Sequence, residues 1–370
     1  MKRPVMLGTL FLVLVLVLGA CAPKAAPSPS PTPTAPTAPS PAPSLGEWDK
    51  VLEAAKKEGT LTLYSTWAAE AGEAMKTGMS KYGIKLETIG GQGGDLELKI
   101  ATEQRAKAYV ADVFTGGWTN QTNTSQAGFG QPVTSALPSL GEKDVWKIYP
   151  GKYDPTNSVY VSGTGVTPSV VINTDLVKKG EITAWNDLLD PKWRDRIVMT
   201  DPRTGSGPGA SGVWVFMPLG EDFWKKMAAQ RITMQVRYDL AVNQVVYGEK
   251  ALVLFPAFSR TVVAIRAGAP LQIVHLKEGT SYYLNGVVMV KNGPHPNASL
   301  VFLNWLFSKE GQIVVGKALG NYTIRNDVVE DWMKIPELNA GTFTVMEPPN
   351  NLDPEASKKA AEFAKNVFGK

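Results

Sequence analysis

Hydroxyl and aromatic side chains follow two strands that the sequence predicts, at residues 60–64 and 112–114. Five residues come just after these strands: Ser65, Thr66, Trp67, Gly117 and Trp118. Open α/β sheets bind ligands at the carboxyl ends of their strands, so these five residues are candidate ligand contacts. Packing in a protein core is the alternative interpretation of both tryptophans.

A glycine-rich loop at residues 204–211 could bind an anion. Its candidate contacts are Thr204, Gly205, Ser206 and Gly207. The loop runs into a helix predicted to begin near Ser211, and N–H groups and hydroxyls at a helix N-terminus attract negative charge. An ordinary flexible turn is an equally good interpretation.

Three arginines could add a charged contact to a carboxylate or phosphonate: Arg203, Arg237 and Arg260. Solvated surface positions are the alternative for each of them. Three aromatic residues complete the candidate set: Tyr238, Phe258 and Tyr282. An aromatic-walled pocket with one anion-binding corner suits a small organic solute carrying a carboxylate, phosphate or phosphonate.

The N-terminus predicts where the protein works. Lys2 and Arg3 precede an apolar run at 5–17, and residues 1–20 have the order of a secretory signal peptide. The run is shorter than the roughly 20 residues that a membrane-spanning helix needs. The ending Leu-Gly-Ala-Cys resembles the bacterial lipobox, which implies that the Cys21 thiol carries a lipid anchor. We therefore expect the mature protein outside the cytoplasmic membrane, in the periplasm or at the cell surface.

Residues 21–45 contain the anchor cysteine and a segment rich in proline, alanine, serine and threonine. Proline favours an extended backbone of about 3.1 Å per residue, so this tether would reach roughly 60–70 Å when fully extended. A tether of this kind holds a globular body near a membrane.

Charge and composition exclude several classes of function. The net charge is +4, and removal of Lys2 and Arg3 leaves +2, which is too small to indicate nucleic-acid binding. Cys21 is the sole cysteine, and His275 and His295 are the only histidines. Neither disulfides nor a histidine-rich metal site is therefore expected, and no cofactor is predicted.

The remaining residues, 45–370, are long enough for two domains. Strands and helices are predicted in alternation, which indicates an α/β fold with largely parallel sheets. The clearest segments are helices at 47–58, 95–107, 221–230 and from Pro296, and strands at 60–64, 112–114, 251–255 and 287–290.

Five segments carry a family resemblance: EWDKVLEAAKKEG at 47–59, NTDL at 173–176, TAWNDLLDPKWRDRI at 183–197, VYGEKAL at 246–252, and GPHPNA with LFSKEGQ between 293 and 312. They resemble the bacterial extracellular solute-binding proteins, in the group that includes the ferric-ion binders. The resemblance implies a periplasmic-binding-protein-like type II fold, with two lobes of mixed, mostly parallel sheets and a hinge of crossover strands. It also implies a monomer that delivers a small-molecule solute to an ABC permease driven by its ATPase.

On this resemblance, lobe 1 comprises residues 46–163 and 279–321, and lobe 2 comprises residues 164–278. A C-terminal helical segment at 322–370 is expected to pack on lobe 2.

Bare ferric iron fits the sequence poorly. The positions that the resemblance assigns to the iron ligands hold Ala68, Gly117, Phe258 and Ser259, whereas ferric iron prefers anionic oxygen or imidazole ligands. The pair Tyr282-Tyr283 lies at a different position. An iron–chelate complex stays open, because anion contacts and stacking could hold a chelator.

Two other classes of function remain as alternatives. A ligand-degrading enzyme on the same fold would lack a cysteine nucleophile once Cys21 is acylated, and Glu221, Asp222 and Asp239 are not spaced as a catalytic pair. No catalytic residue is predicted. A co-receptor that presents its lobes to a sensor kinase cannot be separated from a transport receptor by sequence.

Overall fold

The computed structural model describes residues 45–133, 137–154, 156–205, 207–329, 332, 345–346 and 356–369. The chain divides into two compact units, residues 1–37 and 38–370, and every described residue belongs to the second. The predicted signal peptide, Cys21 and nearly all of the predicted tether lie outside the described residues. None of the helices described is both long and apolar enough to span a bilayer.

The first sheet has six strands in the order β11–β10–β3–β1–β2, with β4 also paired to β10. Strand β1 runs parallel to β2 and β3, whereas β10 runs antiparallel to β3 and β4. The strands are β1 (Thr60–Ser65), β2 (Lys85–Gly90), β3 (Val113–Gly117), β4 (Val159–Thr167), β10 (Thr280–Met289) and β11 (Val345–Met346).

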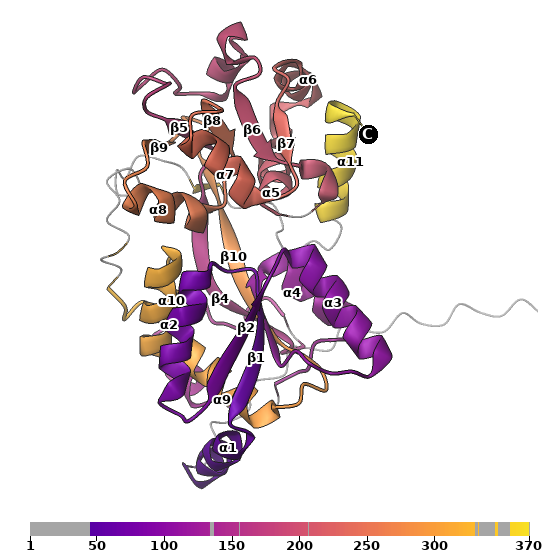
Figure 1. Cartoon of the computed structure of the whole chain (residues 1–370), viewed down its shortest axis with the longest axis vertical. Coiled ribbons are helices and arrows are strands. Elements are labelled where there is room, and N and C mark those ends of the chain that lie inside the picture. The colour runs from indigo at the N-terminus through magenta and orange to yellow at the C-terminus, as the bar shows by residue number, and fades with distance from the viewer. Residues whose placement is uncertain are drawn as a thin grey trace, which may run out of the picture. The chain divides into compact units, whose positions relative to one another are not determined.

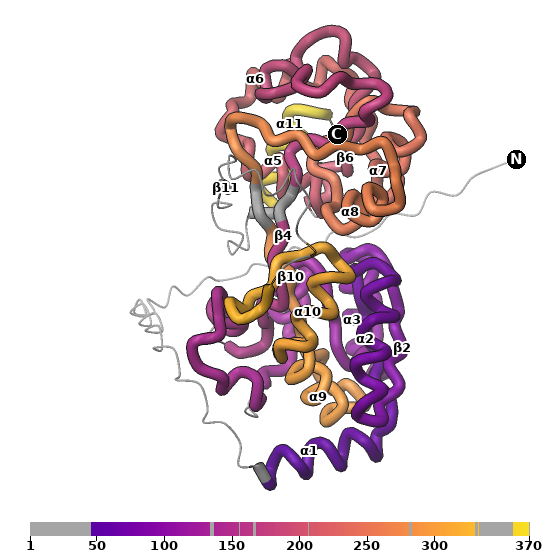
Figure 2. Tube along the Cα trace, turned by 90° about the vertical axis from the view of Figure 1, so that its left-hand side faces the viewer, coloured from indigo at the N-terminus to yellow at the C-terminus, as the bar shows by residue number. Residues whose placement is uncertain are grey.

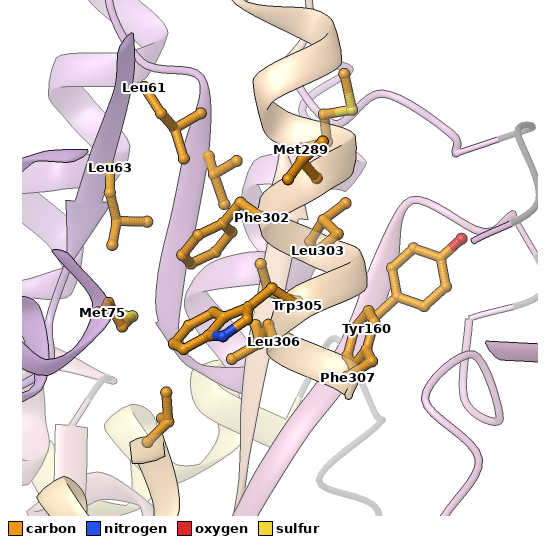
Figure 3. Close-up of a cluster of buried hydrophobic side chains, with 14 of the residues drawn as sticks. Leu61, Leu63, Met75, Tyr160, Met289, Phe302, Leu303, Trp305, Leu306 and Phe307 are labelled. Atoms are coloured by element: carbon orange, nitrogen blue, oxygen red, sulfur yellow. The ribbon is translucent and has the colours of Figure 1, made fainter. Parts of the chain in front are cut away.

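Six helices accompany this sheet (Figure 1): α1 (Leu45–Glu58), α2 (Ala69–Ser80), α3 (Gly93–Ala106), α4 (Trp118–Gln126), α9 (Pro296–Phe307) and α10 (Lys309–Leu319). Alternation along β1 buries Leu61 and Leu63 completely, and they share a core with Phe302 and Trp305 of α9 (Figure 3). Helix α2 packs closely on this core because Gly78, which has no side chain, contacts the Trp305 ring. A Cβ at Gly78 would come 2.2 Å from the indole ring.

The second sheet has five strands in the order β7–β6–β8–β5–β9. They are β5 (Val170–Asn173), β6 (Ile197–Thr200), β7 (Thr233–Gln235), β8 (Leu252–Leu254) and β9 (Leu271–Val274). Its helices are α5 (Gly207–Phe216), α6 (Glu221–Ala229), α7 (Tyr238–Val246), α8 (Phe258–Arg266) and α11 (Ala356–Phe368), visible in Figure 2. The core on one face of this sheet is rich in aromatic rings, with Trp185 lying 4.9 Å from Phe216 and 5.4 Å from Phe255 between ring centroids.

Strands β4 and β10 connect the two sheets. They pair antiparallel along most of their length, β4 leads directly into β5, and β9 leads into β10. At the middle of the pair, the Tyr283 ring lies against Gly165, where a Cβ would come 2.3 Å from the ring. The Tyr283 hydroxyl donates to Asn321 Oδ1 at 2.7 Å. The predicted α/β architecture with crossover strands is confirmed.

Element boundaries differ from the sequence predictions by a few residues. The helix predicted at 95–107 begins at Gly93, and the helix predicted near Ser211 begins at Gly207. The lobe limits stay a prediction. Ile324 lies in the core of the first sheet, whereas α11 packs on the second, where the Phe368 and Trp224 ring centroids are 6.1 Å apart.

Candidate functional site

A pocket of about 330 Å³ lies where loops of both sheets meet. Its wall includes Thr66 and Trp67 after β1, Gly117 at the end of β3, Thr200 at the end of β6 and Pro256 after β8. These are carboxyl ends of strands, where α/β sheets bind ligands. The volume is within the range of about 300–1,000 Å³ that is usual for small-molecule sites.

Five helices begin at this pocket. Their first turns contribute Gly93–Asp95 of α3, Trp118–Asn120 of α4, Gly207–Pro208 of α5, Tyr238 of α7 and Phe258–Ser259 of α8. The first N–H groups of a helix have no partner within the helix, and the helix dipole adds partial positive charge there. The pocket wall therefore carries many backbone donors and a positive potential.

Four of these helix ends have no hydrogen bond from the N-cap side chain: those of α3, α4, α7 and α8. The α7 end is different, because the Asp239 carboxylate lies beside the N–H groups of its own first turn. The Arg237 guanidinium and, more weakly, those N–H groups hold the pKa of the Asp239 carboxyl below its usual value. The donors of α3, α4 and α8 stay available to a ligand.

Three side chains of the wall also have polar atoms without a partner. Trp67 Nε1, Trp118 Nε1 and Thr200 Oγ1 are sealed from solvent and have no hydrogen-bond partner in the described part of the chain. Trp118 is 4% exposed and Thr200 is 5% exposed. An indole N–H can only donate, so Trp67 and Trp118 each hold a buried donor that the described chain leaves unsatisfied.

Charged side chains are scarce in the wall. Among the described residues that line it, Asp95 is the one with a formal charge, and it is exposed. Arg203 pairs with Asp201 at 2.7 Å and Arg237 pairs with Asp239 at 2.6 Å, so neither arginine is directed at the pocket. Arg260 is not among the lining residues; it has no carboxylate partner in the described chain and interacts with the Tyr238 hydroxyl.

Tyr238 joins the two sides of the pocket. Its hydroxyl donates to the Thr66 carbonyl oxygen at 3.0 Å, which connects α7 of the second sheet to the loop after β1 of the first. Burial raises the pKa of Tyr238, and the nearby Arg260 cation opposes that rise only in part. The phenol is therefore protonated at neutral pH and acts as a donor.

Loss of this bond across the pocket is expected to favour a form in which the two sides of the pocket lie further apart. Because one hydrogen bond contributes about 1 kcal/mol, Tyr238→Phe should weaken ligand affinity by roughly fivefold. Isothermal titration calorimetry would measure the affinity, and solution scattering would report a less compact protein. Tyr247→Phe is the matched control, since Tyr247 lies at the other end of α7 and is 75% exposed. Equal affinities of both variants would contradict the role of Tyr238.

Residues 67–340 match the family model described as bacterial extracellular solute-binding protein. The chain belongs to this family. Its members are extracellular binding proteins, and this chain is accordingly a solute-binding receptor.

Three proteins are similar to this chain, one in sequence and two in fold. The spermidine/putrescine-binding periplasmic protein of Salmonella typhimurium is 22% identical over 178 residues, which are 45% of this chain and 50% of the relative. AfuA of Actinobacillus pleuropneumoniae, solved with fructose-6-phosphate, has a TM-score of 0.67 at 22% identity, covering 84% of this chain and 97% of that chain. Iron-bound HitA of Pseudomonas aeruginosa has a TM-score of 0.65 at 20% identity, covering 83% and 99%.

Most of the predicted contacts line the pocket of this solute-binding protein: Thr66, Trp67, Gly117, Trp118, Thr204, Gly207, Tyr238 and Phe258. Ser65 does not. It is 1% exposed, and its hydroxyl accepts hydrogen bonds from Thr115 Oγ1 and the Trp67 N–H.

Four other predicted contacts are not in the described lining. Gly205 ends a 3₁₀ turn in a left-handed conformation, and Arg260 interacts with Tyr238. Ser206 and the Tyr282 side chain lie outside the described residues. The neighbouring residue Tyr283 is the one that lines the pocket.

Several lining residues were missed from the sequence. The most important are Gly93, Asn120, Thr200, Ser211, Ser259 and Asn285. A signal existed for Gly93, because the glycine-rich turn at 90–94 follows a strand and precedes a helix. Asn120 and Asn285 carried no such signal, since their position depends on packing between distant segments.

Proposed function

We propose that this receptor binds a small organic anion and delivers it to an ABC permease and its ATPase. One observation carries the proposal: helices from both sheets begin at one pocket, four of them without a hydrogen bond from the N-cap side chain, so their first N–H groups line its wall. Phosphate and carboxylate oxygens satisfy many donors at once, and helix N-termini stabilise their charge without a counterion.

The other ligand classes fit this wall less well. Bare ferric iron needs several anionic ligands, and the described residues contain no group of three histidine, cysteine or acidic side chains that could hold a metal. Burial raises the pKa values of Tyr238 and Tyr283, which disfavours the phenolate that iron would need. A polyamine would face helix N-termini with Asp95 as its one carboxylate partner in the described lining.

The location and the lack of catalysis are further parts of the proposal. The charged start, the apolar run and the lipobox-like ending at Cys21 support a secreted lipoprotein that stays attached to the outside of the membrane. A receptor role without catalysis is supported by a described pocket wall that contains no cysteine, no histidine and no pair of carboxylates.

A thermal-shift panel tests the ligand class. We expect fructose 6-phosphate or another organic phosphate, at a hundredfold excess over its Kd, to stabilise the protein by about 2.7 kcal/mol. That corresponds to a rise in Tm of roughly 4 °C for a protein of this size. Spermidine and ferric citrate serve as the competing ligands, and mass spectrometry of natively purified protein would identify any retained solute. Stabilisation by spermidine or ferric ion alone would contradict the proposal.

A further inference from the structure

Glu97 contacts two amides beneath the pocket. It lies on α3, half-buried against α4, where the Asn120 amide donates through Nδ2 to Glu97 Oε1. Asn123 donates to the second carboxylate oxygen at 3.3 Å. A carboxylate can only accept, so Glu97 holds the Asn120 side chain with its NH₂ group directed at the carboxylate.

The carbonyl oxygen of Asn120 consequently faces the wall. The whole Asn120 amide lies against Gly93, where a Cβ would come 2.3 Å from Oδ1 and 2.5 Å from Nδ2, and Oδ1 is the amide atom next to Gly117, where a Cβ would come 3.7 Å from it. No donor in the described chain reaches this oxygen. Within a wall dominated by donors, Asn120 therefore offers an unpaired acceptor.

On the second sheet, Asp239 is the one acidic residue in the first turns of α5, α7 and α8, and its carboxylate is paired with Arg237. Thr200, Ser211 and Ser259 contribute hydroxyls there, and the first turns of α5 and α8 contain no acidic residue. The two sides of the pocket thus differ in hydrogen-bonding character. The side formed by the second sheet suits an anionic group, whereas Asn120 requires a ligand group that can donate.

We propose that Glu97 is a positioning residue that fixes Asn120 as an acceptor, and that the solute consequently carries a hydroxyl group beside its anionic group. The hydroxyl of the solute donates to Asn120 Oδ1 while the anionic group occupies the helix ends of the second sheet, and organic phosphates serve as the probes. This inference rests on the proposed function and narrows its ligand class.

The test compares fructose 6-phosphate and glycerol phosphate with inorganic phosphate, with each affinity measured by calorimetry. We expect the wild-type protein to bind the hydroxylated compounds at least tenfold more tightly than inorganic phosphate. In Glu97→Gln the side-chain amide can donate to Asn120 Oδ1, which lets the Asn120 NH₂ turn towards the pocket. In this variant the ratio of the affinity for hydroxylated phosphates to the affinity for inorganic phosphate should fall about fivefold or more. The affinity for inorganic phosphate itself should be unchanged within twofold.

Asn120→Ala is a second variant that removes the acceptor directly, and it should lose the same preference. Glu97→Gln added to Asn120→Ala should then have no further effect, which a merely structural role of Glu97 would not produce. Glu53→Gln, an exposed glutamate on α1, is the matched control and should keep the wild-type preference.

The outcomes separate this inference from the proposed function. If the wild-type protein binds inorganic phosphate and the hydroxylated phosphates equally, or if Glu97→Gln keeps the preference, the inference is overturned and anion binding stands. If neither kind of phosphate binds, the inference is overturned as well, and binding of spermidine or ferric ion in their place overturns the proposed function too.

Discussion

Ser259→Asp should abolish most anion binding while leaving the protein at least as stable as before. Ser259 is the second residue of α8 and lines the pocket. A carboxylate there would sit close to a bound anion, and repulsion of about 2–3 kcal/mol at intermediate dielectric corresponds to a loss of affinity of roughly 30- to 150-fold. Calorimetry with an organic phosphate would measure this loss.

The same substitution should stabilise the helix. An acidic residue in the first turn interacts favourably with the dipole by about 0.3–1 kcal/mol, and α8 at present has no side-chain cap. Arg260 follows directly, at a position where the dipole disfavours a cation, so a neighbouring carboxylate would offset that cost. Thermal unfolding should give a Tm that is unchanged or slightly higher.

Ser259→Asn is the control for the size of the new side chain. It places an uncharged group of the same shape at the helix end, so it should lower affinity by only a few-fold. If Ser259→Asp and Ser259→Asn bind an organic phosphate equally well, charge at this helix end does not matter. The anion would then lie elsewhere in the pocket.

The general architecture could be predicted because its signals are local. Alternating strand and helix patterns, together with the motifs at 173–176 and 183–197, identify the α/β fold with two sheets and crossover strands. The carboxyl ends of β1 and β3 follow from the same pattern, and they place Thr66, Trp67 and Gly117 in the pocket wall. Residues that directly follow a predicted strand lie at the edge of the sheet where ligands bind, so ligand contacts at strand ends can be predicted from the sequence.

Ser65 shows how one residue changes such a prediction. Strand β1 continues through Ser65, which pairs in parallel register with Thr115 of β3. Side chains alternate between the faces of a strand, so a boundary error of one residue assigns a side chain to the wrong environment. The Ser65 hydroxyl consequently belongs to the interior, and Thr66 is the first residue that reaches the pocket.

The arginines show a different limit to the prediction of the site from the sequence. Arg203 and Arg237 each lie two residues from an aspartate, Asp201 and Asp239, and the structure pairs them with those neighbours. This spacing was visible in the sequence and could have removed both from the candidate set. Asn120 was not accessible in this way, because its orientation depends on Glu97 from a different helix.

Asp112→Ala is expected to cause the largest loss of stability among these changes. Asp112 is completely buried just before β3, and it accepts from the Thr62 N–H at 2.7 Å and from the His295 N–H at 2.8 Å. The His295 ring also lies 2.8 Å from the carboxylate. Removal leaves two backbone donors and a histidine without their partner, at about 1–3 kcal/mol each, so the loss should reach roughly 3–5 kcal/mol.

Urea unfolding would measure this loss, with Asp49→Ala as the control because Asp49 is exposed on α1. Asp112→Asn should lose less than Asp112→Ala, since its amide oxygen can still accept one of the bonds. A loss below 1 kcal/mol for Asp112→Ala would contradict the argument. Asp112 precedes β3 and the pocket lies after its end, so Asp112→Ala that is still folded should bind its ligand with wild-type affinity. Stability and recognition therefore depend on opposite ends of the same strand.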